Sequence, residues 1–345
     1  MSLESEIREQ PASLARLLER QAQPVRALAA DLRGREIDSV FLAARGTSDN
    51  AGLYLKYLWG AYNGLPVALA TPSLFTSYGR PPALRRCLVL AVSQSGQSPD
   101  IVAVLDEARR QGAPTLAIVN EAGSPLARAA DRVIDICAGP ELAVAATKSY
   151  TAQLMTIAML SAALAGDEER WQELARVPEL VERALALDER VAVRAERYRF
   201  MDHCVVLGRG FNYATAFEWA LKLKELAYVI AEPYSSADFQ HGPVALIDRG
   251  FPVLAVAPSG PVFADTLALL ERLVEEKHAE LLVVSDAEAA LGLAHTPLPL
   301  PGPAPEWATP LVAIVLGQLF CYHLTRAKGF DTEAPRGLHK VTLTR

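Results

Sequence analysis

The stretch VFLAARGTSDNA, residues 40–51, runs from an apolar strand through Arg-Gly into a helix start, and VVLGRGFNYATA, residues 205–216, repeats this pattern. A second pair, LAVSQSG at 90–96 and LAVAPSG at 254–260, matches in the same way. Gly46 and Gly210 are 164 residues apart, and so are Leu90 and Leu254. The apolar runs 115–120 and 280–285 and the helical stretches 151–165 and 315–329 agree with this spacing within a residue. The constant spacing indicates two copies of one domain.

Short β-branched runs alternate with helical patterns inside each copy. In the first copy we expect strands near 38–44, 87–92, 115–119 and 132–136, with helices from 49, near 99–111 and at 124–130. Such alternation predicts an α/β fold in which each domain is a parallel sheet flanked by helices on both faces. The predicted domains are 35–185 and 195–335, with an N-terminal helical segment at 1–34 and a C-terminal tail at 336–345.

Composition excludes several classes of protein. The 345-residue chain carries a net charge of -6 with scattered basic residues, which gives no footprint for nucleic acid. No apolar run reaches the roughly 18 to 20 residues that span a bilayer, and the charged amphipathic N-terminus does not resemble a secretion signal. The four cysteines are far apart and form no C-x-x-C pair, which argues against disulfides and zinc. We expect a cytoplasmic protein without nucleic-acid or membrane partners.

Hydroxyl and amide side chains cluster where two strands of the first copy end. Ligands of parallel sheets bind beyond the carboxyl ends of the strands, where helix N-termini attract anions. These positions predict a phosphate site made by Gly46, Thr47, Ser48, Ser93, Gln94, Ser95 and Ser98. Helix capping is the alternative, because serine is a preferred N-cap in any protein. The second copy reads APSGP at the corresponding turn and lacks the Ser-Gln pair, which favours a binding role for the first copy.

Five segments together resemble the tandem sugar-isomerase (SIS) family, and most of all the isomerase half of the glutamine:fructose-6-phosphate aminotransferases. The segments are RGTS (45–48), SQSGQS (93–98), AVAATKSYTAQL (143–154), LGRGFNYATAFEWALKLKELAYVIAEPYSSADFQHGP (207–243) and DTEAPRGLHKVTL (331–343). The resemblance covers nearly the whole chain. It implies a sugar-phosphate substrate, a homodimer with shared active sites, and no metal or other cofactor.

The chain departs from the aminotransferase pattern at several positions. Ser2 stands where those enzymes have a nucleophilic cysteine, so we expect no glutamine hydrolysis by this chain. Arg45 and Asp49 look more like the standalone SIS-type deaminases and deglycases. Ala146 replaces a serine of the family's A-S-T-K motif. The expected activity is conversion of glucosamine 6-phosphate to fructose 6-phosphate and ammonia. Fructosamine-6-phosphate deglycation, ammonia-dependent glucosamine-6-phosphate synthesis and a non-catalytic sugar-phosphate sensor stay open.

The resemblance also implies the catalytic residues. Glu225 matches the family's base, and on residues alone it sits in an apolar helix where we expect it to be partly buried, with Lys222 on the same helix face. His241, in a predicted loop, matches the ring-opening residue, which relatives supply to the neighbouring subunit. Lys340 matches the lysine that engages the open-chain carbonyl, in a tail whose alternating apolar residues predict docking. Val144 and Ala146 match positions that line the sugar.

Overall fold

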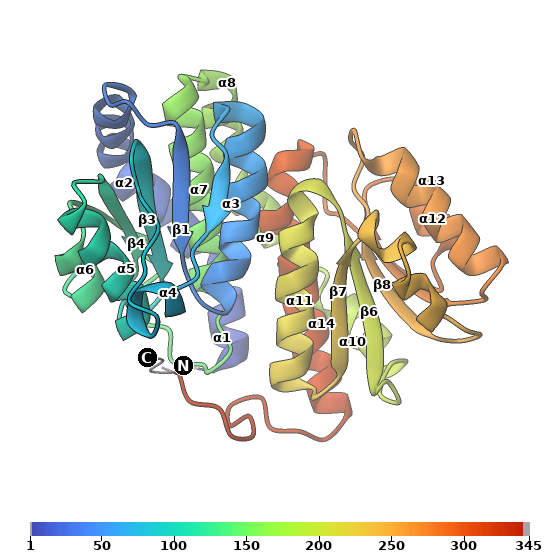
Figure 1. The fold of residues 1–345 in the computed structure, drawn as a ribbon. Coiled ribbons are helices and arrows are strands. Elements are labelled where there is room, and N and C mark those ends of the chain that lie inside the picture. The colour runs from blue at the N-terminus through green and yellow to red at the C-terminus, as the bar shows by residue number, and fades with distance from the viewer. Residues whose placement is uncertain (1, 341–345) are drawn as a thin grey trace. The chain divides into compact units, whose positions relative to one another are not determined.

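The computed structural model describes residues 2–340, which form two compact units (Figure 1). The first unit contains residues 9–142, 146–178 and 339–340; the second contains 2–8, 143–145 and 179–338. Each is described by itself below. The predicted N-terminal segment 1–34 and the predicted tail 336–345 are therefore each divided between the units, and residues 341–345 of the tail lie outside the described residues.

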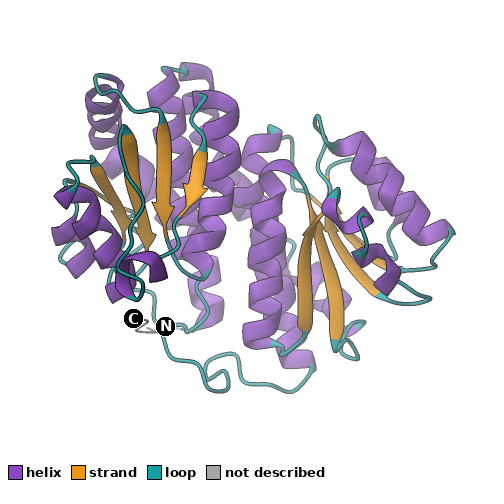
Figure 2. Ribbon diagram, in the orientation of Figure 1, coloured by secondary structure: helices purple, strands orange, loops and turns teal. Residues whose placement is uncertain are grey.

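Each unit is built on a parallel sheet, as predicted (Figure 2). Each sheet has five strands, whereas the sequence indicated four in the first unit and missed the short β2. The order is β2-β1-β3-β4-β5 in the first unit and β10-β9-β8-β6-β7 in the second. Because β6 to β10 repeat the places of β1 to β5 in chain order, the topology confirms the two-copy prediction. The first set is Ser39–Ala43, Val67–Leu69, Cys87–Ser93, Thr115–Val119 and Arg132–Asp135; the second is His203–Gly208, Ile230–Ser235, Pro252–Val256, Glu280–Ser285 and Thr296–Pro299.

Helices cover both faces of the first sheet. On one face α5 (Pro99–Arg110) and α6 (Pro125–Ala129) bury apolar side chains such as Val104 and Leu126 against β3 and β4. The other face carries α3 (Thr47–Asn63), on which α7 (Lys148–Ala165) and then α2 (Gln10–Arg33) pack. All seven residues of β3 are buried, as is usual for a central strand of a parallel sheet. Short helices α4 (Ser73–Thr76) and α8 (Glu168–Leu174) complete this unit, and α9 (Val177–Leu185) leads into the second.

The second sheet is covered in the same way. Helices α12 (Phe263–Glu275) and α13 (Glu288–Leu293) pack on one face, and α11 (Tyr213–Leu226) lies on the other beneath α14 (Thr309–Ala327). Helices α10 (Asp188–Glu196) and α1 (Leu3–Arg8) pack on α14. Within residues 2–340, the connections of this unit contain the 3-10 turns η1 (Gly210–Asn212), η2 (Asp238–Gln240), η3 (Pro243–Leu246) and η4 (Glu306–Ala308).

The expectation that no segment is long and apolar enough to span a bilayer was wrong for one helix of the described chain: Glu306–Ala327 meets both criteria by length and composition. Its most apolar stretch is 94% buried, which is typical of the core helix of a folded domain. The four cysteines are free and buried.

Candidate functional site

The two hydroxyl-rich turns of the first unit lie next to each other. They follow β1 and β3, which are paired strands with Ala43 opposite Ala91. Arg45 in the first turn donates from Nε and Nη2 to Oδ2 of Asp100, at 2.9 and 2.7 Å, and Asp100 lies in the first turn of α5. This ion pair joins the turn after β1 to the helix that follows β3. The two turns therefore lie at the same edge of the first sheet.

Two serine hydroxyls of the turn after β3 accept hydrogen bonds from backbone amides of the same turn. The Gly96 amide donates to Ser93 Oγ at 3.0 Å, and the Gln97 amide donates to Ser95 Oγ at 3.4 Å. Gly96 has φ +62°, and a Cβ there would lie 2.1 Å from Oγ of Ser124, so only glycine fits. The result is an internally hydrogen-bonded turn that leads directly into α5.

Capping does not account for these hydroxyls. Ser98 is the N-cap of α5 but makes no side-chain cap bond, and the N-cap of α3 is Gly46, which has no side chain. Ser124 and Asp167, by contrast, cap α6 and α8 by accepting from backbone amides. The N-cap residues of α3 and α5 thus make no side-chain bond to these helix N-termini, where an anion can bind, although Asp100 Oδ1 already accepts from the Ile101 amide of α5 at 2.9 Å.

Ser48 has a partner that the sequence did not suggest. Nε2 of Gln153, a fully buried residue of α7, donates to Ser48 Oγ at 3.0 Å. A hydroxyl that accepts this bond still has its own proton to donate. Gln153 thus orients Ser48 as a donor at the start of α3.

The corresponding place in the second unit contains a carboxylate. Glu306 packs against the turns after β6 and β8: a Cβ on Gly210 would lie 3.3 Å from its Oε1, and a Cβ on Gly260 would lie 2.5 Å from its Oε2. Burial raises the pKa of Glu306. A carboxylate here repels phosphate, which supports the interpretation that the second copy has diverged from phosphate binding.

Helix α11 of the second unit carries a buried lysine between two carboxylates. Lys222 Nζ lies 2.5 Å from Oε2 of Glu225 and 3.3 Å from Oε1 of Glu218. Lys222 and Glu218 are almost fully buried, whereas the Glu225 side chain is 24% exposed. Burial alone would lower the pKa of Lys222, but Glu218 and Glu225 outweigh it and raise that pKa. The partial burial of Glu225 and its pairing with Lys222 are as predicted; Glu218 was missed.

His241 follows η2 in an exposed turn, as predicted. Its backbone amide donates to the Asp238 carbonyl at 3.0 Å. The imidazole is therefore on the surface of the second unit, where a ligand can reach it.

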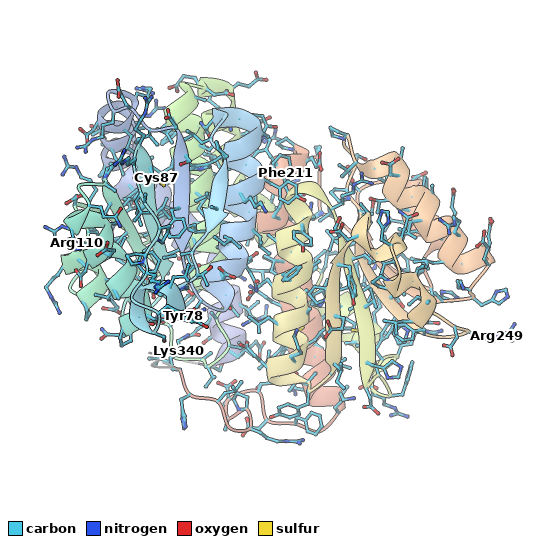
Figure 3. All side chains as sticks on the ribbon, in the orientation of Figure 1. Tyr78, Cys87, Arg110, Phe211, Arg249 and Lys340 are labelled. Carbon is cyan, nitrogen blue, oxygen red and sulfur yellow. The ribbon has the colours of Figure 1, made fainter. Side chains whose placement is uncertain are left out.

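Lys340 is docked in the first unit. Figure 3 labels Lys340. Its Nζ lies 2.8 Å from Oε2 of Glu141, which precedes α7, and its side chain is 22% exposed. The tail was predicted to dock through its alternating apolar residues, but Leu338 is exposed, and Val341 and Leu343 lie outside the described residues. The contact that the structure shows is the Lys340–Glu141 ion pair. Ala146, which precedes α7 in this unit, is partly exposed, and so is Val144, which belongs to the second unit. Among residues 2–340, no group of three or more His, Cys, Asp or Glu could hold a metal ion.

A family model described as the SIS domain matches residues 35–163 and 200–290, one match in each unit. The chain belongs to the SIS domain family. The first match contains β1 to β5 and the second contains β6 to β9, so the internal repeat is a tandem pair of SIS domains.

Curated relatives of this SIS chain include glutamine–fructose-6-phosphate aminotransferases [isomerizing]. The enzyme of one Thermus thermophilus strain is 38% identical over 316 residues, covering 89% of this chain and 52% of its own length. That of Methanothermobacter thermautotrophicus is 39% identical over 307 residues, covering 88% and 51%. The chain thus spans about half the length of the curated relatives it matches.

Solved structures resemble this SIS chain over nearly its full length. A protein of Silicibacter pomeroyi DSS-3 named as a phosphosugar isomerase is 36% identical with a TM-score of 0.86, covering 96% of this chain and all of its own. The C-terminal domain of the aminotransferase from Francisella tularensis is 29% identical with a TM-score of 0.86, covering 96% of this chain and 98% of its own. The glucosamine-6-phosphate deaminase of Thermotoga maritima, at 21% identity and TM-score 0.79, covers all of both chains and shares the fold.

Sequence reasoning missed four residues of these sites: Glu141, Gln153, Glu218 and Glu306. A weak signal existed for two of them, because the chain has only seven lysines and Lys222 and Lys340 stood out among them. A lysine in an apolar helix is expected to pair with a carboxylate. Glu218 lies one helical turn before Lys222, so this spacing could have predicted it as the partner.

Proposed function

We propose that this SIS protein is a phosphosugar aldose–ketose isomerase that deaminates glucosamine 6-phosphate to fructose 6-phosphate and ammonia. The observation that carries the proposal is the Lys222–Glu225 pair on α11, a partly exposed carboxylate at the position of the family's base. The aminotransferase relatives named as isomerizing, and the deaminase that shares the fold, support the choice of an amino-sugar phosphate.

The chemistry assigns a role to each group. Ser48, Ser93, Gln94, Ser95 and Ser98, with the amides of the turns, hold the phosphate. His241 and Lys340 open the ring, and in this proposal His241 acts in the active site of a second copy of the chain. Glu225 takes the proton from C2 and returns it to C1, while the Lys222 ammonium stabilises the charged carboxylate. Water then adds to the C2 imine and ammonia leaves, so one water is consumed for each ammonia released.

Ala146 bears on the choice of substrate. A methyl group stands where the aminotransferase motif has a hydroxyl, and it is partly exposed. A deglycase would need room here for an amino-acid adduct, so fructosamine 6-phosphate is the second substrate to test. Thr147 and Lys148 keep the family motif.

Ammonia release from purified protein given glucosamine 6-phosphate tests the proposal. We expect stoichiometric ammonia and fructose 6-phosphate, and no amino sugar from fructose 6-phosphate plus glutamine. Release of a free amino acid from fructosamine 6-phosphate, with none of these products from glucosamine 6-phosphate, would favour the deglycase. Phosphosugar binding without turnover of either substrate would favour a sensor.

A further inference from the structure

Glu141 is a fully buried carboxylate with four hydrogen-bond partners. Oε1 accepts from the amides of Thr147 and Ser149, both at 3.0 Å. Oε2 accepts from Ser149 Oγ at 2.7 Å and from Lys340 Nζ at 2.8 Å. Three of these donors belong to the first turn of α7 and its N-cap; the fourth comes from the C-terminal tail. One carboxylate therefore connects the start of a core helix to the end of the chain.

The partners keep this carboxylate charged. Burial by itself would raise the pKa of Glu141, but the Lys340 ammonium and the amides of Ser149 and Thr147 outweigh burial and hold that pKa below its ordinary value. A buried charge costs several kcal/mol when it is unpaired, so the fold strongly favours a cation at the place of Lys340. Among the described residues of the first unit, Lys340 is the cation that the structure puts there.

Glu141 is also connected to the phosphate turn. The Asn120 amide, at the end of β4, donates to the Gln94 carbonyl at 3.3 Å. The Asn120 side chain donates to the Gly139 carbonyl at 2.8 Å and accepts from the Ala138 amide at 3.0 Å. These bonds fix the segment that leads into Glu141 relative to Ser93–Ser98. These bonds and the Glu141 ion pair together fix the position of Lys340 relative to the turns that we assign to phosphate.

We propose that Glu141 is the positioning residue for Lys340: it docks the C-terminal tail at the N-terminus of α7 and sets the point from which the lysine reaches the sugar carbonyl. The catalytic part of this inference rests on the proposed function; the docking part does not. In the Lys340–Glu141 pair an ammonium donates a hydrogen bond to a carboxylate, so Lys340 is positioned in its charged form. To act as a nucleophilic amine, it would first have to leave Glu141 and lose a proton.

Trypsin cleavage tests docking without any assumption about activity. In the full chain, cleavage after Lys340 requires the lysine to leave Glu141, whereas exposed Arg336 provides an internal reference site. We expect Glu141→Gln to speed cleavage after Lys340 by about 10-fold or more relative to Arg336, the factor that follows from losing a hydrogen bond between charged groups. Glu121→Gln, the same change on the exposed loop after β4, should leave the ratio unchanged. An unchanged ratio in Glu141→Gln would overturn the docking role.

Kinetics test the positioning role. On glucosamine 6-phosphate, or on fructosamine 6-phosphate if that is the substrate, Lys340→Met and Glu141→Gln should each lower kcat/KM at least about 10-fold, and the double variant should be no worse than Lys340→Met. Losses that multiply would show that Glu141 acts only by capping α7, and would overturn the proposal. Lys340→Met leaves Glu141 buried without its cation, so melting curves first establish that both single variants are folded before their kinetics are compared. If the wild-type protein turns over neither substrate, the proposed function fails, while the cleavage ratio still decides the docking.

Discussion

The ammonium of Lys222 lies 2.5 Å from a carboxylate oxygen of Glu225, one turn along the same helix. The second carboxylate, Glu218, contacts the same nitrogen at 3.3 Å from the buried side. Lys222 therefore has a structural task, which is to neutralise Glu218 inside the core, and a functional one, which is to hold Glu225 in place. Substitutions of Lys222, Glu218 and Glu225 distinguish the structural task from the functional one.

Lys222→Met should be strongly destabilising because it leaves Glu218 buried without its cation. Breaking a buried ion pair from one side costs about 3 to 5 kcal/mol of unfolding free energy. Chemical denaturation measures it. Lys224→Met, two residues along and exposed, should change stability by less than about 0.5 kcal/mol. Adding Glu218→Gln to Lys222→Met should restore part of the loss; a double variant less stable than the single one would contradict the pairing.

Gly96→Ala should destabilise the protein more than Gly79→Ala. Both glycines have φ near +60°, so both changes carry the same left-handed strain of about 1 kcal/mol. Only at Gly96 would the new Cβ also meet another atom, Ser124 Oγ at 2.1 Å; at Gly79 no such atom lies within 4 Å. The comparison isolates the steric cost of closing the turn after β3. Equal losses at the two sites in denaturation curves would show that the turn adapts to a side chain.

Ser98→Ala tests phosphate binding against helix capping. Ser98 makes no cap bond, so its loss should leave thermal stability nearly unchanged and weaken phosphosugar affinity about 10-fold, as for a hydrogen bond to a charged group. Asp167→Ala is the matched control. Asp167 caps α8, so this variant should lose about 1 kcal/mol of stability and keep its affinity. Calorimetric titration and melting curves check both, and the reverse pattern would make Ser98 a capping residue.

Much of this arrangement could be predicted from the sequence, for a physical reason. Parallel strands and their following turns are consecutive in the chain, so the 164-residue repeat and the hydroxyls at 46–48 and 93–98 were visible as patterns. The partners that complete the sites were not visible. Gln153 meets Ser48 across 105 residues and Lys340 meets Glu141 across 199, distances over which local periodicity carries no information. Glu306 was missed because its neighbours, Gly210 and Gly260, have no side chains to signal a contact.

Glu306 gives the protein a predictable pH dependence. Burial raises the pKa of Glu306 in the folded state above its unfolded value near 4.5. Above the folded pKa, the ionised carboxylate therefore lowers the stability of the folded protein. This loss disappears as the pH falls below 4.5, because the carboxyl is then protonated in both states. Glu306→Gln should therefore raise the Tm at pH 7 by about 1 to 3 °C and have no effect near pH 4. Glu271→Gln, on the exposed side of α12, should show no such pH-dependent difference. A Tm gain for Glu306→Gln that is larger at pH 4 than at pH 7 would contradict this sign.

The most direct measurement of the central claim follows the proton that Glu225 is proposed to move. Glucosamine 6-phosphate is incubated with the protein in D2O, and deuterium at C1 of the fructose 6-phosphate product is measured by NMR. We predict deuterium at C1 with the wild-type protein and with Glu275→Gln, a surface control on α12, and a rate lowered about 10²- to 10⁴-fold in Glu225→Gln with phosphosugar binding retained. Labelled product formed by Glu225→Gln at the wild-type rate would show that another group moves the proton, and would contradict the claim.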